Sequence, residues 1–346
     1  MSTTITGQEI RQQPAVIRRL LEREQEAVQQ IAASLMGRFD HVLIAARGTS
    51  DNAARYAKYL LGAHNRLPVS LATPSLYTLY HRPPRLERTL VIGISQSGQS
   101  PDIVSVVQEG RRQRQLTLAI TNDPESRLAG VAEYIIPLHA GPERAVAATK
   151  TYTASLAALA LFSLALENHA ARLDQLREVP ATMEAALAAL HPLMARVERY
   201  RYIKHCVVIG RGFNYSTAFE VALKIKELTR TVAEPYSSAD FRHGPIAMLD
   251  PGFPVFVISP LGAIHGDMGE LVSTLATKSA ELLIVSDDPA LLDQAHLPLP
   301  LPVGLPEWLT PLVTVLAGQL FSLTLAQEKG LDPDRPEGLT KVTETW

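Results

Sequence analysis

Three short segments of the sequence recur at one offset of 164 residues, and this internal repeat limits the possible folds more than any other feature. The matching pairs are residues 41–48 with 205–212, 91–95 with 255–259, and 118–123 with 282–287 (205 − 41 = 164). Each segment is a run of β-branched and aliphatic residues that ends in Gly, Ser, Asn or Asp. Such runs are typical of strands that are buried on both faces and leave their sheet through a tight turn. The repeat therefore predicts two copies of one strand-and-helix arrangement.

Helical patterns follow several of these strands, at residues 52–61, 101–113 and 216–228. Pro101 stands at a favourable first-turn position of its helix. The alternation of strands and helices predicts an α/β fold with two doubly wound parallel-sheet domains in tandem. We expect an N-terminal helical segment over 1–34, a first domain over 35–170, a second domain over 171–330 that opens with helix near 175–200, and an extended C-terminal tail over 331–346.

Composition narrows the class of protein. The 346 residues are 46% apolar and carry a net charge of -2, so the totals show no electrostatic signature of a nucleic-acid-binding protein. The single cysteine, Cys206, cannot form an internal disulfide, and we read it as a packing residue. Residues 1–30 contain no apolar run of signal-peptide length, and the apolar stretches 154–166 and 309–326 read as buried helices. We expect a cytoplasmic protein without a membrane span.

The two copies differ in the turn after their second matching strand. The first copy reads Ser95-Gln96-Ser97-Gly98-Gln99-Ser100, whereas the second reads Ser259-Pro260-Leu261-Gly262. Hydroxyl groups and backbone N–H groups at a helix N-terminus suit a phosphomonoester, and Thr49 and Ser50 on the neighbouring turn add hydroxyls. The alternative is plain helix capping by Ser97 or Ser100. The turn lacks the lysine of a nucleotide P-loop and the spaced glycines of a dinucleotide fold, so neither ATP nor NAD is implied.

A second group of candidate residues lies in the other copy. Glu220, Lys224 and Glu227 are spaced by four and three residues, which places them on one face of a helix. His243 follows in a loop that ends in Gly and Pro, and a carboxylate with a histidine is a usual pair for moving protons near neutral pH. The alternatives are a solvated Glu220–Lys224 ion pair and a histidine that is merely a surface loop residue.

Several motifs in a fixed order give the chain a family resemblance that covers nearly its whole length. They are Gln8-Glu-Ile-Arg-Gln-Gln-Pro14, Ile94-Ser-Gln-Ser-Gly98, Ala147-Ala-Thr-Lys150, Ala222-Leu-Lys-Ile-Lys-Glu227, Arg242-His-Gly-Pro245 and Leu339-Thr-Lys341. The chain resembles the sugar isomerase (SIS) family, whose domains are flavodoxin-like. Within it, the chain is most similar to the isomerase half of glutamine–fructose-6-phosphate aminotransferase and to the stand-alone SIS-type glucosamine-6-phosphate deaminases.

The resemblance implies roles for individual residues. A phosphosugar would be bound by Thr49, Ser50, Ser95, Gln96, Ser97, Ser100, Val146 and Ala147. Glu227 would be the proton-transfer base, His243 the ring-opening acid and base, and Lys224 an active-site cation. Lys341, which unaided reads as a tail lysine, would contact the open-chain carbonyl and form a Schiff base. The family's chemistry needs no metal or organic cofactor.

Two departures from the aminotransferase pattern shape the expected function. Residue 2 is Ser, where the glutaminase domain has its nucleophilic cysteine, and Ala148 stands where the aminotransferase has Ser before Thr-Lys. We therefore expect an isomerase/deaminase that converts glucosamine 6-phosphate to fructose 6-phosphate and ammonia. Two alternatives stay open: the same chemistry on another aminated sugar phosphate, such as a galactosamine or fructosamine phosphate, and a non-catalytic phosphosugar-binding regulator. The resemblance also implies a homodimer with shared active sites, which binds hexosamine or hexose 6-phosphates and neither nucleic acid nor membrane.

Overall fold

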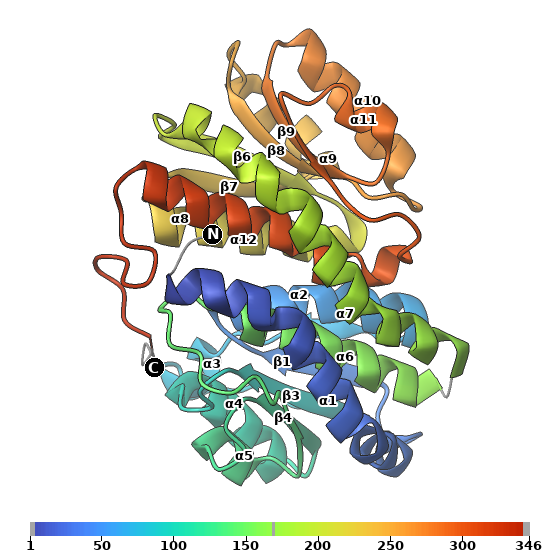
Figure 1. Cartoon of the computed structure of the whole chain (residues 1–346). Coiled ribbons are helices and arrows are strands. Elements are labelled where there is room, and N and C mark those ends of the chain that lie inside the picture. The colour runs from blue at the N-terminus through green and yellow to red at the C-terminus, as the bar shows by residue number, and fades with distance from the viewer. Residues whose placement is uncertain (1–3, 168–169, 342–346) are drawn as a thin grey trace. The chain divides into compact units, whose positions relative to one another are not determined.

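The computed structural model describes residues 4–167 and 170–341, and the chain divides into two compact units (Figure 1). Counting described residues alone, the first unit comprises residues 15–143, 150–177 and 340–341. The second unit comprises residues 4–14, 144–149 and 178–339. One unit boundary therefore falls inside helix α1 (Ile5–Leu35) and another inside helix α7 (Ala170–Leu190).

The first unit is a parallel sheet of five strands in the order β2-β1-β3-β4-β5. The strands are β1 (His41–Ala45), β2 (Val69–Leu71), β3 (Thr89–Ser95), β4 (Leu116–Thr121) and β5 (Tyr134–Pro137). The helices are α2 (Gly48–Asn65), α3 (Ser75–Thr78), α4 (Pro101–Arg112), α5 (Arg127–Val131) and α6 (Lys150–Glu167). Helices α2 and α6 lie on one face of the sheet, and α4 and α5 lie on the other (Figure 1).

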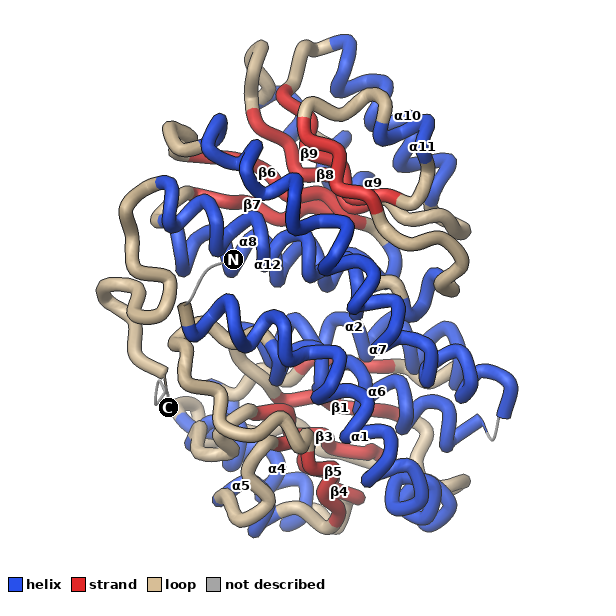
Figure 2. The backbone as a smooth tube through the Cα atoms, viewed as in Figure 1, coloured by secondary structure: helices blue, strands red, loops and turns tan. Residues whose placement is uncertain are grey.

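The second unit repeats this plan with the order β10-β9-β8-β6-β7. Its strands are β6 (His205–Gly210), β7 (Val232–Ser237), β8 (Pro254–Ile258), β9 (Glu281–Ser286) and β10 (Leu297–Pro300). Its α-helices are α8 (Tyr215–Thr229), α9 (Ser238–Arg242), α10 (His265–Thr277), α11 (Pro289–Leu292) and α12 (Pro311–Glu328), with 3-10 helices η1 (His191–Tyr200), η2 (Gly212–Asn214), η3 (Pro245–Met248) and η4 (Glu307–Leu309). Figure 2 shows α8 and α12 together on one side of this sheet and α10 and α11 on the other.

The predicted fold class is confirmed. Counted from its own first strand, each sheet has the order 2-1-3-4-5, which is the flavodoxin-like doubly wound order. All seven residues of β3 and all six of β4 are buried, because helices cover both faces of the sheet. The six segments of the repeat are the three central strands of each sheet, and the edge strands lie outside it.

The two apolar stretches form helices α6 and α12, and both are buried along nearly their whole length. In α12 the close approach to α8 needs a residue without a side chain, because a Cβ on Gly318 would lie 2.2 Å from Val221 Cγ2. Burial of each large aliphatic side chain contributes roughly 1.5–3 kcal/mol to folding. Within residues 4–167 and 170–341, no helix combines the length and apolarity that a membrane span requires.

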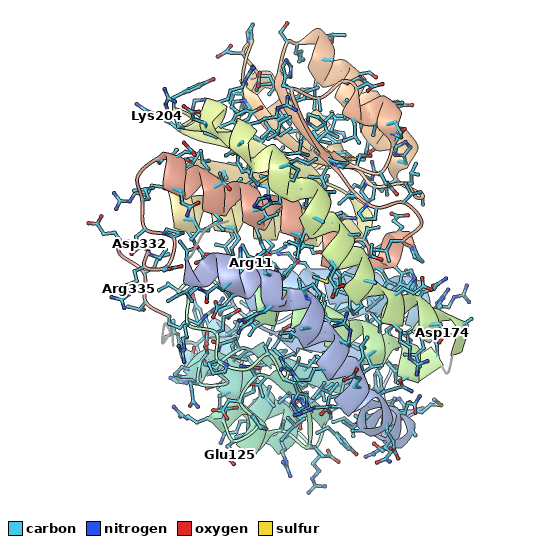
Figure 3. All side chains as sticks on the ribbon, viewed as in Figure 1. Arg11, Glu125, Asp174, Lys204, Asp332 and Arg335 are labelled. Atoms are coloured by element: carbon cyan, nitrogen blue, oxygen red, sulfur yellow. The ribbon has the colours of Figure 1, made fainter. Side chains whose placement is uncertain are left out.

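The C-terminal segment after α12 has neither helix nor strand through residue 341. It is nevertheless anchored. The Asp334 carboxylate accepts hydrogen bonds from the backbone N–H groups of Ile5 and Thr6, each at 2.8 Å, and from the Thr6 hydroxyl at 2.9 Å. A carboxylate at this position satisfies unpaired N–H groups at the start of α1. Figure 3 marks the neighbouring Asp332 and Arg335 on the same segment.

Candidate active site

The hydroxyl-rich turn of the first unit joins β3 to α4. Gly98 has a positive φ of 62°, and its N–H donates to Ser95 Oγ at 3.1 Å. Only glycine fits here, because a Cβ would lie 2.1 Å from Ser126 Oγ. The turn is thus pressed against the buried Ser126, which fixes the positions of the N–H and hydroxyl groups around Gly98.

Plain capping of α4 finds no support in the contacts of this turn. Ser100 occupies the N-cap position, yet its side chain makes no capping hydrogen bond. Ser97 Oγ accepts a hydrogen bond from the N–H of Gln99 at 3.3 Å, which lies within the turn and before the helix. Neither serine therefore caps α4, whose first turn instead contains the Asp102 carboxylate, the acceptor of a hydrogen bond of 2.9 Å from the N–H of Ile103.

The neighbouring turn joins β1 to α2 and carries Thr49 and Ser50 in the first helical turn. Because β1 and β3 are adjacent parallel strands, both turns lie at the same edge of the sheet. Arg47 Nε makes an ion pair of 2.8 Å with the fully buried Asp102 at the start of α4, which ties the two turns together. A Cβ on Gly48, which has a φ of 53°, would meet no described atom within 4 Å.

Helix α8 of the second unit carries the candidate base. Lys224 Nζ pairs with Glu227 Oε2 and lies 3.5 Å from Glu220 Oε1. The side chains of Lys224 and Glu220 are 1% and 0% exposed, so the interpretation of this pair as solvated is wrong. The side chain of Glu227 is 23% exposed. The buried Lys224 ammonium thus lies between two carboxylates, of which that of Glu227 reaches the surface. This arrangement can place a base beside a fixed positive charge.

His243 lies at the exposed end of α9, where its backbone N–H donates to the carbonyl of Asp240. The preceding residue, Arg242, is held by Asp267 of α10 through an ion pair of 2.6 Å. Asp267 also pairs with Arg211 at 2.8 Å and accepts a hydrogen bond from Ser238. Burial raises the pKa of the Asp267 carboxyl, but the hydrogen bonds from Ser238, Arg242 and Arg211 outweigh burial and hold this pKa below its usual value. This network fixes the backbone next to His243.

Val146 and Ala147 belong to the second unit, although their sequence neighbours on either side belong to the first. The Val146 N–H donates to the carbonyl of Asp334 at 3.3 Å. Ala147 is buried against Leu228, the residue that follows the candidate base in α8, and against Ala326. The segment 144–149 is therefore packed beside the helix that carries Glu227.

Lys341 has a partner that the sequence did not indicate. Its Nζ lies 2.9 Å from Glu143 Oε2, and the Glu143 side chain is 0% exposed. The same carboxylate accepts hydrogen bonds from the N–H and the hydroxyl of Thr151 at 3.1 and 2.8 Å. A buried carboxylate with three such donors is well compensated, so Glu143 fixes the place of the Lys341 ammonium.

The family assignment follows from the match of the sequence to a known family model. The model of the SIS domain matches residues 38–165 and 200–290, which together make up more than half of the chain. The chain belongs to the SIS domain family.

This SIS chain is similar to two aminotransferases and to a deaminase. It is 35% identical over 354 residues to a glutamine–fructose-6-phosphate aminotransferase (isomerizing) of Gloeobacter violaceus, covering 96% of this chain and 57% of that protein. Among solved structures, the C-terminal domain of a glucosamine-fructose-6-phosphate aminotransferase from Francisella tularensis superposes with a TM-score of 0.86 and 25% identity, covering 97% and 99% of the two chains. A glucosamine-6-phosphate deaminase from Thermotoga maritima has the same fold, with a TM-score of 0.82, 21% identity and coverage of 99% and 100%.

The SIS chain thus spans little more than half the length of the curated relative that it matches. These comparisons relate the chain to the C-terminal domain of the isomerizing fructose-6-phosphate aminotransferases.

The predicted site residues are divided between the two units. The first unit holds Thr49, Ser50, Ser95, Gln96, Ser97, Ser100 and Lys341, and the second holds Val146, Ala147, Lys224, Glu227 and His243. The sequence did not single out Glu143, Asp102 or Asp267. The two aspartates could have been sought from the Arg-Gly pair that follows the first strand of each repeat. Arg47 binds Asp102, and Arg211 binds Asp267.

Cys206 is buried, and burial raises the pKa of its thiol to about 12, which is the behaviour of a packing residue. The described residues include no group of three or more His, Cys, Asp or Glu side chains that could hold a metal ion.

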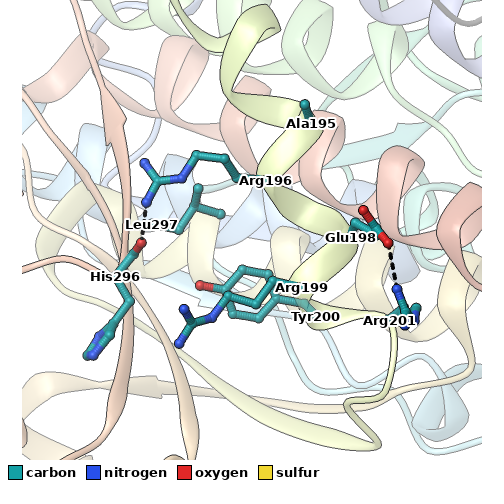
Figure 4. Close-up of a pocket in the computed structure, with 8 residues that line it drawn as sticks. All are labelled: Ala195, Arg196, Glu198, Arg199, Tyr200, Arg201, His296 and Leu297. Carbon is teal, nitrogen blue, oxygen red and sulfur yellow. Dashed lines mark hydrogen bonds and ion pairs between the residues drawn. The ribbon is translucent and has the colours of Figure 1, made fainter.

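A hollow of about 460 Å³ lies beside η1 and β10 of the second unit (Figure 4). Arg196, Arg199 and Arg201 line it together with His296. Two of these guanidinium groups are paired with carboxylates, Arg199 with Glu281 at 2.9 Å and Arg201 with Glu198 at 2.6 Å. None of the predicted site residues lines this hollow, so it is separate from the candidate catalytic groups.

Proposed function

We propose that the protein is an amino-sugar-phosphate isomerase/deaminase that converts glucosamine 6-phosphate and water to fructose 6-phosphate and ammonia. The observation that carries the proposal is the α8 arrangement, in which a buried Lys224 lies between Glu220 and the partly exposed Glu227. Membership of the SIS family and the similarity to an isomerizing aminotransferase support the substrate class. Ala148, where the aminotransferase pattern has Ser, favours the branch that releases ammonia.

The phosphate of the substrate is bound by the turn between β3 and α4. Its donors are the hydroxyl and amide groups of Ser95, Gln96, Ser97 and Ser100, with Thr49 and Ser50 on the adjacent turn. The Arg47–Asp102 ion pair holds the two turns together. A dianion at the start of the 12-residue helix α4 is stabilised by the helix dipole and by the hydroxyl and amide donors of the turn.

Proton transfer is the task of Glu227. In the open-chain sugar, the carboxylate takes the proton from C2 and returns it to C1. The C1 oxygen gains a proton and the C2 amine loses one, so that an aldehyde with a neighbouring amine becomes an alcohol with a neighbouring imine. The Lys224 ammonium stabilises the negative charge that develops on oxygen during this transfer. The neutral Lys341 amine then displaces ammonia from the C2 imine, and water hydrolyses the resulting Schiff base to the ketone of fructose 6-phosphate and the free amine.

His243 opens the sugar ring by moving a proton between the ring oxygen and the C1 hydroxyl. Lys341 contacts the open-chain sugar and forms its Schiff base at C2, in place of the ammonia that leaves, and Val146 and Ala147 contact the sugar. In this scheme Glu143 is a positioning residue, because it touches Lys341 rather than the sugar.

The first experiment is an assay of ammonia release from glucosamine, galactosamine and fructosamine phosphates in the absence of glutamine. We expect the highest rate with glucosamine 6-phosphate, together with exchange of solvent deuterium into fructose 6-phosphate. Protein that binds these sugar phosphates but shows neither activity would instead be a phosphosugar-binding regulator.

We also propose that the protein is a homodimer whose active sites are shared between chains. Mixing Glu227→Gln chains with His243→Ala chains tests this, because heterodimers would regain one intact site if the two residues of a site come from different chains. A monomer in sedimentation that retains full activity would refute the proposal.

A further inference from the structure

The segment 144–149, which holds two of the residues expected to contact the sugar, has neither helix nor strand. Its flanks are tied to each other. The N–H and the hydroxyl of Thr151 donate to the Glu143 carboxylate, and Lys150 Nζ donates to the carbonyl of Pro142 at 2.8 Å. These ties close the segment into a short loop, which we call the 144–149 loop.

Three consecutive N–H groups of this loop are bound by acceptors from the start of α1 and from the C-terminal segment. Glu9 Oε1 accepts a hydrogen bond of 2.6 Å from the N–H of Arg144, and Glu9 Oε2 accepts one of 3.3 Å from the N–H of Ala145. The N–H of Val146 donates to the carbonyl of Asp334 at 3.3 Å. One carboxylate thus binds two successive peptide groups, so it fixes the direction of the backbone as well as its position.

The Glu9 carboxylate is itself held firmly. Glu9 is only 3% exposed, and a buried carboxylate needs donors that replace its lost water. Bonds from N–H groups to a carboxylate are roughly twice as strong as bonds between neutral groups. The first turns of α1 are fixed on both sides of Glu9: the N–H of Thr6 is bound by Asp334 at 2.8 Å, and Gln13 donates to Gln319 at 2.7 Å.

The 144–149 loop buries alternate side chains, as an extended chain does. The buried ones are those of Ala145, Ala147 and Thr149. Val146 and Ala148 are half-buried, so their side chains are the ones that a ligand can reach. A rotation of the two peptide groups that Glu9 binds would turn the Val146 side chain away from this position.

We propose that Glu9 is a positioning residue for sugar recognition: its carboxylate fixes the 144–149 loop so that Val146 and Ala147 can contact the substrate. The inference rests on the proposed function, in which these two residues contact the sugar while the turn between β3 and α4 binds the phosphate. Loss of the Glu9 carboxylate should therefore weaken the binding of the sugar and spare the binding of phosphate. It also gives a role to the motif that begins at Gln8, one of those that carry the family resemblance.

The first test is Glu9→Gln, which keeps the size of the side chain and one acceptor oxygen but turns an NH2 group toward one of the two N–H groups. Calorimetric titrations with glucosamine 6-phosphate and with inorganic phosphate separate the two parts of the site. The Kd of glucosamine 6-phosphate should rise at least about tenfold. The Kd of inorganic phosphate should change by less than about twofold. In turnover, KM should rise with the Kd while kcat changes less, because the lost contacts bind ground state and transition state alike.

Hydrogen exchange reports on the loop without any ligand. The amides of Arg144 and Ala145 should exchange at least about tenfold faster in Glu9→Gln than in the parent, whereas those of residues 95–100 should be unaltered. Asp287→Asn is the matched control, because the Asp287 carboxylate is also buried and accepts a hydrogen bond of 2.7 Å from the N–H of Leu261. This control should leave both affinities and the exchange of the 144–149 loop unchanged.

Unchanged exchange of the two amides in Glu9→Gln would overturn the proposal. An equal loss of affinity for both ligands, or the same loss of sugar-phosphate affinity in Asp287→Asn, would also overturn it. If Glu9→Gln does not fold, Glu9→Asp decides, because its shorter side chain cannot reach both N–H groups from the same backbone position. A selective loss of glucosamine 6-phosphate affinity in Glu9→Asp supports the proposal, and parent-like affinity refutes it.

Failure of this proposal and failure of the proposed function give different results. A parent chain that binds glucosamine 6-phosphate but releases no ammonia refutes the enzyme activity, and the titrations and the exchange rates still test the role of Glu9. Ammonia release by the parent, together with parent-like titrations and exchange in Glu9→Gln, refutes the role of Glu9 alone.

Discussion

Replacement of Gly98 by Ala tests the packing of the phosphate turn. The φ of 62° is a left-handed conformation, which costs a residue with a side chain roughly 1–2 kcal/mol. The new methyl would also lie 2.1 Å from Ser126 Oγ and 2.4 Å from Ser126 Cβ. Ser126 is only 2% exposed and its hydroxyl accepts the capping hydrogen bond from Ala129, so it cannot move away freely. Overpacking of this kind costs about 1–3 kcal/mol.

The expected loss of unfolding free energy for Gly98→Ala is therefore about 2–5 kcal/mol. Gly37→Ala is the matched control, because Gly37 has a φ of 73° but a Cβ there would meet nothing within 4 Å. The control should lose only the conformational cost of about 1–2 kcal/mol. The difference between the two variants isolates the clash with Ser126.

Denaturant unfolding gives the two stabilities, and calorimetric titration with glucosamine 6-phosphate gives the affinity. Relief of the clash shifts the turn, so Gly98→Ala should bind the sugar phosphate at least about tenfold more weakly, whereas Gly37→Ala should bind it like the parent. Equal unfolding midpoints for the two variants, with unchanged affinity in Gly98→Ala, would refute both the packing of the turn and its role in phosphate binding.

Three further variants test the proposed base, the positioning residue Glu143 and the Asp267 network beside His243. Glu227→Gln keeps the shape of the side chain but removes the base, so turnover should fall by roughly a hundredfold or more with little change in sugar-phosphate affinity; equal turnover would remove Glu227 from the mechanism. Glu143→Gln should lower kcat by roughly tenfold, leave KM nearly unchanged and reduce borohydride trapping of substrate on Lys341, whereas a purely structural role would leave trapping per folded molecule unaltered. Asp267→Asn should cost about 1–2 kcal/mol at pH 7, as measured by denaturant midpoints. Because the native pKa of Asp267 lies below its usual 3.8, its contribution is present above 3.8 and is lost as the pH falls through the lowered pKa, so the gap between wild type and variant should narrow below pH 3.8; a gap that does not narrow on acidification would contradict the ion-pair explanation.

The short edge strands cannot be recognised from the local sequence, whereas the central strands can. The central strands are runs of aliphatic residues, and burial on both faces makes such runs visible in the sequence. In contrast, β2 has three residues that are not fully buried, and the edge strands β7 and β10 contain prolines. Proline is tolerated at an edge because its missing N–H faces no partner strand, but it removes the usual strand signal. The position of an edge strand therefore depends on its pairing with the neighbouring strand and not on a local sequence pattern.

The sequence by itself determined the features that depend on neighbouring residues and on the repeat: two α/β copies, the turn with its hydroxyl groups, and the common face of Glu220, Lys224 and Glu227. Only the tertiary structure decided that this last group is buried, and that Lys341 meets Glu143 across 198 residues of chain. Only the tertiary structure, likewise, placed Glu307 in the turn before α10, 44 residues from its partner Ala263. Periodicity records which face of an element is apolar, whereas the partner of a charged side chain depends on how distant elements pack, and no local pattern encodes that packing.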